Sequence, residues 1–483
     1  MLKHPCLQPR AAGLAFLTLW LLTVAAGNAE AQIIWNSAGG GTWNASGSWT
    51  PATIPNAIGA NATFNGAATG SNPDQNANRT VTLDAAQTVG SIVFNTDLST
   101  FTNSLTTGTA GSLTFDQTGT GPATITTMGA GTGNNTISVP IILTDSLTGI
   151  VNNTAASSAA GSLNLTATIT GAGGFTKQGD GLATFGTGTK TYTGPTVLSG
   201  GRMRISVTAQ PSATSSFTIN AGAQLDIITA GTIAVGSGPL NLNGVGATTG
   251  PYAAFPGAIR NDRGLAVTFS NPVVLQSNTL IHVQANVGTG STSSPVGSTT
   301  FSNTISGPGR LTFTAPGSDI EQGFLILNGA NTYTGGTLVA GGILQVSGAG
   351  ATLGTGNVTV DNASSPASIA RLQILAGVSN AINNLATLTL AGGGTAGVAD
   401  QNYIDLGAGI NDTVAQLVLG GVTQVAGTYG STASTATFKN DEYFTGTGII
   451  TVTGVPEPGS LALVGFGFAG FAVRVTRRKR RRA

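Results

Sequence analysis

The feature that most constrains this chain is an internal repeat of short apolar runs separated by glycine. Residues 192–201 read Tyr-Thr-Gly-Pro-Thr-Val-Leu-Ser-Gly-Gly, and residues 333–342 read Tyr-Thr-Gly-Gly-Thr-Leu-Val-Ala-Gly-Gly. Three further matches keep the same order along the chain: 140–143 with 272–275, 169–173 with 305–309, and 236–242 with 354–360. A duplicated unit with small insertions explains this common order better than chance.

Within each copy the apolar residues alternate with polar ones in runs too short for helices. Examples are residues 163–165, 182–185 and 196–198. Such alternation buries one face of a strand, and glycine at the corners permits the positive φ that a sharp turn needs. A rung of this kind buries its apolar face only by stacking on its neighbours. We therefore predict an all-β fold, an elongated right-handed parallel β-helix (β-solenoid) with Gly-rich turns. A set of β-sandwiches is the alternative.

The repeat carries a signature that resembles a known family. Segments 171–205 and 306–346 resemble the autotransporter-associated β-strand repeat, although the second departs from it over 312–323. The resemblance implies a passenger-like β-helix and a surface location. It does not imply autotransport, because we expect no outer-membrane barrel after residue 455. The signature residues are Lys177, Tyr192, Gly194, Tyr333, Gly335 and Gly336.

The N-terminus has the three parts of a secretory signal peptide. Lys3 and Arg10 form a basic region, an apolar stretch covers residues 11–26, and Ala29 and Ala31 frame a small-x-small cleavage site. We predict Sec export and a mature chain that begins at Gln32. A permanent anchor helix is the alternative.

The C-terminus combines a short motif, an apolar run and a basic tail. The motif is Pro456-Glu457-Pro458, and thirteen uncharged residues follow at 461–473. As a helix this run is about 20 Å long, and flanking residues bring it closer to the ~30 Å needed to span a bilayer. We predict a transmembrane helix whose basic tail stays cytoplasmic. The tail cluster is Arg477, Arg478, Lys479, Arg480, Arg481 and Arg482.

This three-part order resembles the PEP-CTERM sorting signal of Gram-negative bacteria. The resemblance covers only the last 29 residues of the chain. It implies recognition by an exosortase, which removes the tail and passes the protein outward through an inner-membrane intermediate. A simple tail anchor with a chance Pro-Glu-Pro is the alternative.

Charge and cysteine content exclude several classes of function. Residues 32–454 hold ten basic and sixteen acidic side chains, a net charge of −6, whereas seven of the nineteen basic residues lie from Arg474 onward. An acidic body without a basic stripe argues against nucleic-acid binding. The single cysteine, Cys6, lies in the leader, so neither disulfides nor thiolate chemistry are expected in the mature protein.

Few residues of the mature chain could serve in catalysis or bind a metal. His282 is the one histidine of the mature chain, and with no cysteine it cannot build a zinc site or join a nucleophile motif. We place it on a strand, pointing outward. Paired carboxylates could serve a polysaccharide lyase or hydrolase, or hold calcium. We predict no catalytic residue, metal or cofactor. The candidate pairs are Asp319 with Glu321, Asp400 with Asp405, and Asp441 with Glu442.

Both ends of the mature body have features of caps. Trp35, Trp43 and Trp49 precede the first rungs, where they would cap the stack; a sugar-binding aromatic platform is the alternative. Residues 427–430 and 441–448 resemble a closing module that precedes PEP-CTERM signals. Terminal caps prevent end-to-end association of a solenoid.

These observations give a domain plan and a functional hypothesis. We predict an exported structural protein of the cell surface or extracellular matrix, with exosortase and Sec machinery as partners and exopolysaccharide association or adhesion as its task. A polysaccharide-active enzyme and a non-catalytic carbohydrate-binding protein are the rivals. The predicted parts are signal peptide 1–31, N-terminal cap and first rungs 32–137, repeat units 138–269 and 270–361, C-terminal module 362–454, and sorting signal 455–483.

Overall fold

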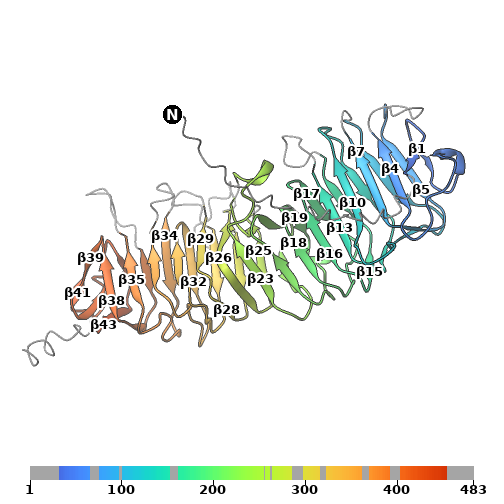
Figure 1. Ribbon diagram of the computed structural model, residues 1–483. Helices are drawn as coiled ribbons and strands as arrows, with labels where there is room; N and C mark the ends of the chain where they lie inside the picture. Colours follow the sequence, from blue (N-terminus) through green and yellow to red (C-terminus); the bar gives the residue numbers. More distant parts are fainter. Residues whose placement is uncertain are drawn as a thin grey trace, which may run out of the picture. The chain divides into compact units, whose positions relative to one another are not determined.

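The computed structural model describes most of the chain between Gln32 and Thr453 (Figure 1). The leader with Ala29 and Ala31, the sorting motif, the predicted transmembrane helix and the basic tail therefore lie outside the described residues. Within them, no helix is long and apolar enough to cross a membrane. The described ranges are 32–65, 75–96, 100–152, 161–254, 256–261, 264–284, 297–315, 323–361, 369–391 and 403–453.

The described chain is a parallel β-solenoid whose rungs have three faces, which we call A, B and C. Strands of one face pair in parallel with the strand of the next rung, so the sandwich alternative is wrong. Face A comprises β1 (Ile33–Trp35), β4 (Asn61–Asn65), β7 (Ser91–Asn95), β10 (Ala123–Met128), β13 (Leu147–Val151), β16 (Phe175–Gln178), β18 (Thr196–Leu198), β20 (Phe217–Ile219), β23 (Leu240–Gly244), the first part of β26 (Val273–Val283) and β28 (Ile305–Ser306).

Face B follows face A along the chain in each rung. Its strands are β2 (Gly41–Thr42), β5 (Arg79–Leu83), β8 (Asn103–Thr107), β11 (Asn135–Ile137), β14 (Leu163–Leu165), β17 (Leu182–Phe185), β19 (Gly201–Ile205), β21 (Ala223–Ile227), β24 (Ile259–Asn261), the second part of β26, β29 (Leu311–Thr314), β31 (Thr337–Val339), β33 (Val358–Val360), β35 (Thr387–Leu390) and β38 (Gln416–Leu419).

Face C completes each rung before the chain returns to face A. In two rungs this face has no strand, only isolated parallel β-bridges that join Ile169 to Lys190 and Lys190 to Pro211. Its strands are β6 (Ala86–Val89), β9 (Ser112–Phe115), β12 (Ile141–Leu143), β15 (Ile169–Gly171), β22 (Gly231–Ile233), β25 (Ala266–Phe269), β27 (Ser298–Phe301), β30 (Phe324–Leu327), β32 (Gly342–Val346), β34 (Ala370–Ile374), β36 (Ile404–Leu406) and β42 (Phe444–Gly446).

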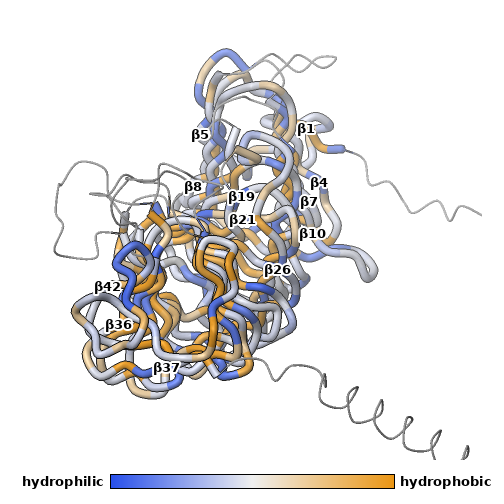
Figure 2. Tube along the Cα trace, turned by 90° about the vertical axis from the view of Figure 1, so that its left-hand side faces the viewer, coloured by the Kyte–Doolittle hydropathy of each residue, from blue (hydrophilic) through white to orange (hydrophobic). Residues whose placement is uncertain are grey.

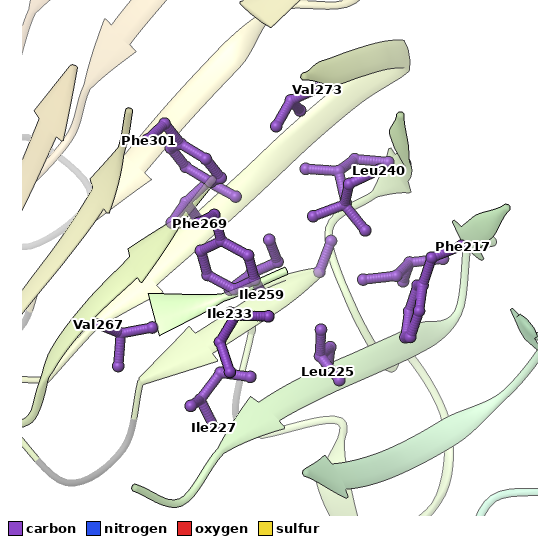
Figure 3. Close-up of a cluster of buried hydrophobic side chains, with 14 of the residues drawn as sticks. Phe217, Leu225, Ile227, Ile233, Leu240, Ile259, Val267, Phe269, Val273 and Phe301 are labelled. Atoms are coloured by element: carbon purple, nitrogen blue, oxygen red, sulfur yellow. The ribbon is translucent and has the colours of Figure 1, made fainter. Parts of the chain in front are cut away.

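Alternating apolar side chains from all three faces fill the interior. In one cross-section Phe217 comes from face A, Leu225 from face B and Ile233 from face C, and each is fully buried (Figure 3). Figure 2 views the solenoid from the end where β36 and β42 lie, and each turn carries both hydrophobic and hydrophilic residues. One continuous cluster of buried residues runs from Trp35 to Val452. Each rung thus contributes to a shared core that it could not form alone.

The two repeat copies fold alike but occupy different faces. In the first copy β16 pairs with β18 on face A, and in the second the equivalent strands β29 and β31 pair on face B. The long strand β26 belongs to both faces. Its Val273 lies on face A, in line with β18, β20 and β23, whereas its Thr279 lies on face B and pairs with Leu311 of β29. The second copy is therefore displaced by one face around the rungs.

An antiparallel addition caps the first rung. Strand β3 (Trp49–Thr50) pairs antiparallel with β1, a short 3-10 turn η1 (Ser46–Ser48) precedes it, and the three tryptophans are at most 1% exposed. Trp49 meets Trp35 edge to face at 5.0 Å, and Phe64 lies 5.6 Å from Trp49. This burial against the first rung agrees with the capping interpretation. The aromatic platform is wrong, because no indole face is open to a sugar.

The last rungs close with antiparallel pairs as well. Strand β39 (Val422–Thr423) folds back on β38. A four-stranded sheet joins β37 (Asn411–Val414), β43 (Ile449–Val452), β40 (Gly427–Gly430) and β41 (Phe438–Lys439), in which β40 runs antiparallel to β43. Breaking the parallel register at both ends removes the template for further strand addition.

Candidate functional site

The signature residues of the repeat contact the backbone of neighbouring rungs. The Lys177 side chain is fully buried, and its Nζ donates to the carbonyl oxygens of Gly179 and, at 2.8 Å, Gly200. It thus ties together the corners of two successive rungs. Burial lowers the pKa of Lys177 to about 7, and the nearby Asp180 carboxylate opposes this shift. Lys190 repeats the arrangement with the carbonyls of Ala167 and Gly188.

The glycines of the signature permit close backbone contact. A Cβ atom added to Gly194 would collide with the backbone of Gly173 and Gly174 in the previous rung, and one on Gly335 would meet the backbone of Gly309 and Arg310. Gly336, with φ +85°, adopts a conformation that suits glycine. The signature residues therefore serve the packing of neighbouring rungs.

One outward row on face B changes character along the stack. From β5 to β17 the row consists of uncharged side chains, whereas from β19 to β24 it is charged, and the histidine of β26 follows. Register pairs each residue with the same position of the next rung. The row reads Thr80, Ser104, Thr136, Asn164, Thr184, Arg204, Asp226, Arg260, His282 and Thr314.

Asp226 is the centre of the charged part, which we call the charged ladder: Arg202, Arg204, Asp226, Arg260 and His282. The Asp226 carboxylate is fully buried, and its Oδ2 lies 2.7 Å from Arg204 Nε and 3.7 Å from Arg202 Nη1. Its Oδ1 is buried without a hydrogen-bond partner among the described residues. Burial of an ion pair costs desolvation that good geometry only partly returns.

Among the described residues, one segment lies over this ladder: residues 245–257, which we call the cover segment; position 255 lies outside the described residues. It leaves β23, forms the 3-10 turn η3 (Gly250–Tyr252) and returns to β24. Gly257 can lie on the ladder because it lacks a side chain: a Cβ there would stand 2.9 Å from the His282 Cβ, and its φ is +122°.

Polar contacts attach the cover segment to face B. Gln224 Nε2 donates to the Gly257 carbonyl at 3.0 Å, and Arg260 Nη1 donates to the Pro256 carbonyl at 3.3 Å. The Tyr252 ring lies over the Arg202 guanidinium, 4.3 Å from its central carbon. Among the described residues of the cover segment, Ala247 and Tyr252 form a small apolar cluster with Leu182, and this cluster is separate from the main core.

His282 has an unusual environment for a residue predicted to point outward. It does alternate with the core residues Ile281 and Val283, yet the cover leaves it only 5% exposed. Its Nδ1 lies 3.2 Å from Thr314 Oγ1, and Nε2 has no partner among the described residues. Burial and then the charges of Arg260 and Arg202 lower the pKa of His282 to about 3, so the ring is neutral.

The described members of the candidate carboxylate pairs do not form a metal-binding group. Asp319, Glu321 and Asp400 lie outside the described residues. Asp405 accepts from Gln373 Nε2 at 2.8 Å, and Asp441 accepts from the Thr432 backbone N–H at 2.7 Å on the exposed cap. Within the described ranges, no three His, Cys, Asp or Glu side chains are grouped as a metal site.

The charged ladder escaped sequence-based prediction although part of its signal is visible. Arg202 and Arg204 alternate with Met203 and Ile205, which indicates one polar side of a strand. The partners Asp226 and Arg260 sit one and two rungs away, and only the register places them together.

Comparisons with known proteins match both the repeat and the C-terminus. The family model of the passenger-associated-transport repeat matches residues 175–205 and 322–346, which are β16 to β19 and β30 to β32. The model of the PEP-CTERM protein-sorting motif matches residues 454–479. Both resemblances drawn from the sequence are confirmed, and the second repeat match starts at residue 322, at the end of the region 312–323 where that copy departs from the pattern.

One relative with a descriptive name is found. The chain is 32% identical over 251 residues to a protein named Adhesin BmaC autotransporter from Brucella suis biovar 1 (strain 1330). The match covers 50% of this chain but only 6% of that protein, so the chain spans a small part of its relative. No solved structure matches the chain significantly. Together the sorting motif, the repeats and this relative indicate an exported surface protein.

Proposed function

We propose that this chain is a non-catalytic structural protein of the bacterial surface or matrix, exported as a precursor and processed at both ends. The match of residues 454–479 to a sorting motif carries the proposal. Sec export would remove residues 1–31, and an exosortase would then cut near Pro456, Glu457 and Pro458 while the apolar run and basic tail hold the precursor in the inner membrane.

The solenoid supports an adhesive or scaffolding role. Stacked rungs with a shared core and capped ends present long rows of side chains without requiring a pocket. The relative named as an adhesin supports an adhesive role.

Mass spectrometry of the protein from fractionated cells tests the processing. We expect the outer or extracellular fraction to contain a chain that begins at Gln32 and ends near the Pro-Glu-Pro motif. A Pro456→Ala, Pro458→Ala variant should remain in the inner-membrane fraction at the mass of the tailed chain. An outer-fraction protein that still ends at Ala483 would contradict exosortase processing.

A further inference from the structure

Exposed apolar side chains gather at the C-terminal end of the solenoid, where β39, β41 and β43 lie together (Figure 1). Of the eight large hydrophobic side chains that are exposed among the described residues, four belong to this end, and they include the three most exposed. Their exposed fractions are 85% for Leu385, 67% for Val425, 64% for Val422 and 42% for Phe438. We call these four residues the exit patch.

One side of the exit patch lies next to the point where the chain leaves the solenoid. Thr453, the last described residue, donates its backbone N–H to the Val414 carbonyl at 3.1 Å. The following residue, Ala415, donates in turn to the carbonyl of Ala386 at 3.1 Å, and Ala386 is the chain neighbour of Leu385. Leu385 is therefore two hydrogen-bonded steps from the exit.

The other side of the exit holds Val425 and Phe438. Val452 pairs with Gly427 where β43 meets β40, and a Cβ atom on Gly427 would lie 2.7 Å from the Phe438 ring. That ring stacks on Tyr429 with 4.8 Å between centroids, and the Tyr429 phenol donates to the Val425 carbonyl at 2.8 Å. Grouped apolar surface of this kind marks contact with a protein or a membrane.

The surface around the exit is also poor in charge. The described residues 381–391 and 413–438 contain no Asp, Glu, Lys or Arg. Lys439, Asp441 and Glu442 follow directly and are exposed at the edge of the cap. An uncharged surface gives up no strong hydration when it leaves water for the interface of a lipid bilayer.

The sequence after the exit favours a bilayer as the partner of the patch. Seven residues, 454–460, separate Thr453 from the apolar run 461–473. Fully extended, they reach about 25 Å, so an apolar run held in a bilayer keeps the exit patch near its surface. Two copies of a chain associate stably through about 20–30 residues a side, many more than this patch provides. A tether, by contrast, makes even a weak contact persist.

We propose that the exit patch docks on the lipid bilayer of the inner membrane while the tail is attached. The four side chains would enter the boundary between headgroups and acyl chains and hold residues 454–460, with the Pro-Glu-Pro motif, at the membrane surface. Because the patch is small, the contact would end once the tail is removed. This inference rests on the proposed function, in which the tail provides the tether.

A fluorescent label on the patch tests the docking. With Cys6→Ser the chain has no cysteine, so Val425→Cys places one nitrobenzoxadiazole label on the full-length chain in vesicles of phosphatidylethanolamine and phosphatidylglycerol. Lipids with a nitroxide near the headgroup should quench this label by about half, because interfacial side chains lie about 5–10 Å into that boundary. A label at Ile142→Cys, 40% exposed on β12, should stay unquenched.

Polar variants of the patch distinguish docking from simple closeness to the vesicle. Leu385→Asn and Val422→Asn alter exposed side chains, so circular dichroism should show an unchanged fold. Together they should remove most of the quenching at position 425, whereas Ile58→Asn, at a position that is 51% exposed in the N-terminal cap, should not. Unchanged quenching in the double variant would mean that the tether alone brings the label to the lipid, and would overturn the docking.

Cutting the tether tests whether the docking depends on it. A thrombin site inserted after Gly454 allows the tail to be removed in the vesicles. The solenoid should then appear in the supernatant, and its label should lose the quenching. A solenoid that stays on the vesicles after the cut would contradict the dependence on the tail.

Flotation of the vesicles separates this inference from the proposed function. A chain that does not float contradicts anchoring by the tail, and the docking fails with it. A chain that floats without quenching at position 425 contradicts the docking alone. Quenching at both 425 and 142 would mean that the solenoid lies along the bilayer and that the exit patch has no special part. A disulfide dimer of the unlabelled Val425→Cys chain, without quenching of the labelled one, would assign the patch to a second copy.

Discussion

The phenol oxygen of Tyr192 lies 2.6 Å from the hydroxyl oxygen of Thr196 inside the first repeat. Tyr333 and Thr337 repeat this contact at 2.6 Å in the second copy, although that copy occupies another face. Both tyrosines are fully buried, and burial raises the pKa of each phenol, so both stay neutral. The contact belongs to the repeat itself and is independent of its position around the rung.

Removing this hydrogen bond should destabilise the solenoid measurably. Tyr333→Phe should lower the free energy of unfolding by about 1 kcal/mol, because a buried hydroxyl loses its partner. Urea unfolding followed by circular dichroism measures the change. The double variant Tyr333→Phe, Thr337→Val should cost little more than the single one, because both remove the same bond. Fully additive costs would contradict the pairing.

Lys177 should make stability depend on pH. Its pKa in the folded chain is about 7, below the ordinary value of 10.5, so between these values the unfolded chain binds more protons. The free energy of unfolding should therefore rise as pH increases from 7 toward 10.5, and this contribution is absent below pH 7. Unfolding in urea across this range measures it.

The Lys177 prediction has a matched control. Lys177→Met should remove its share of the rise and leave that of Lys190, whose pKa burial lowers to about 8, whereas Lys439→Met, at an exposed position on the cap, should keep the full rise. An unchanged slope in the Lys177 variant would show that its amine does not titrate in this window.

The tryptophan cap should carry much of the stability of the first rungs. Trp49→Ala should lower the free energy of unfolding by about 3–5 kcal/mol, because it leaves a cavity beside Trp43 and Phe64. Hydrogen exchange should accelerate most in β4 and β5. Ile58→Ala, which truncates a side chain that is 51% exposed, should change little. A neutral Trp49 variant would argue against capping.

Glycine at the repeat corner should be irreplaceable. Gly335→Ala should cost about 1–3 kcal/mol, because the new methyl group meets the backbone of the previous rung. Gly47→Ala serves as the control, since nothing lies within 4 Å of a Cβ at that position. Denaturation midpoints of the two variants give the comparison. Equal midpoints would mean that the rungs can move apart at this corner.

Much of the architecture was predictable from local pattern. Alternation in 182–185 and 196–198 predicted strands that do form, and the glycines at 194 and 335 marked corners. The capping function of Trp35 and Trp49 followed from their position. Solvent exposure could not be predicted in the same way. His282 points away from the core, as the alternation predicts, but it is buried because another segment of the chain lies over it, and alternation within one strand does not indicate such a segment.

By itself the sequence determined the strand type, the repeat, its signature residues and the terminal motifs, because these depend on neighbours only a few positions apart. The tertiary structure alone decided which face each copy occupies and which side chains share a row. Rungs differ in length, so small insertions accumulate until the second copy starts one face later. Asp226 therefore meets Arg204 and Arg260 through inter-rung register, a relation between distant residues that no local pattern contains.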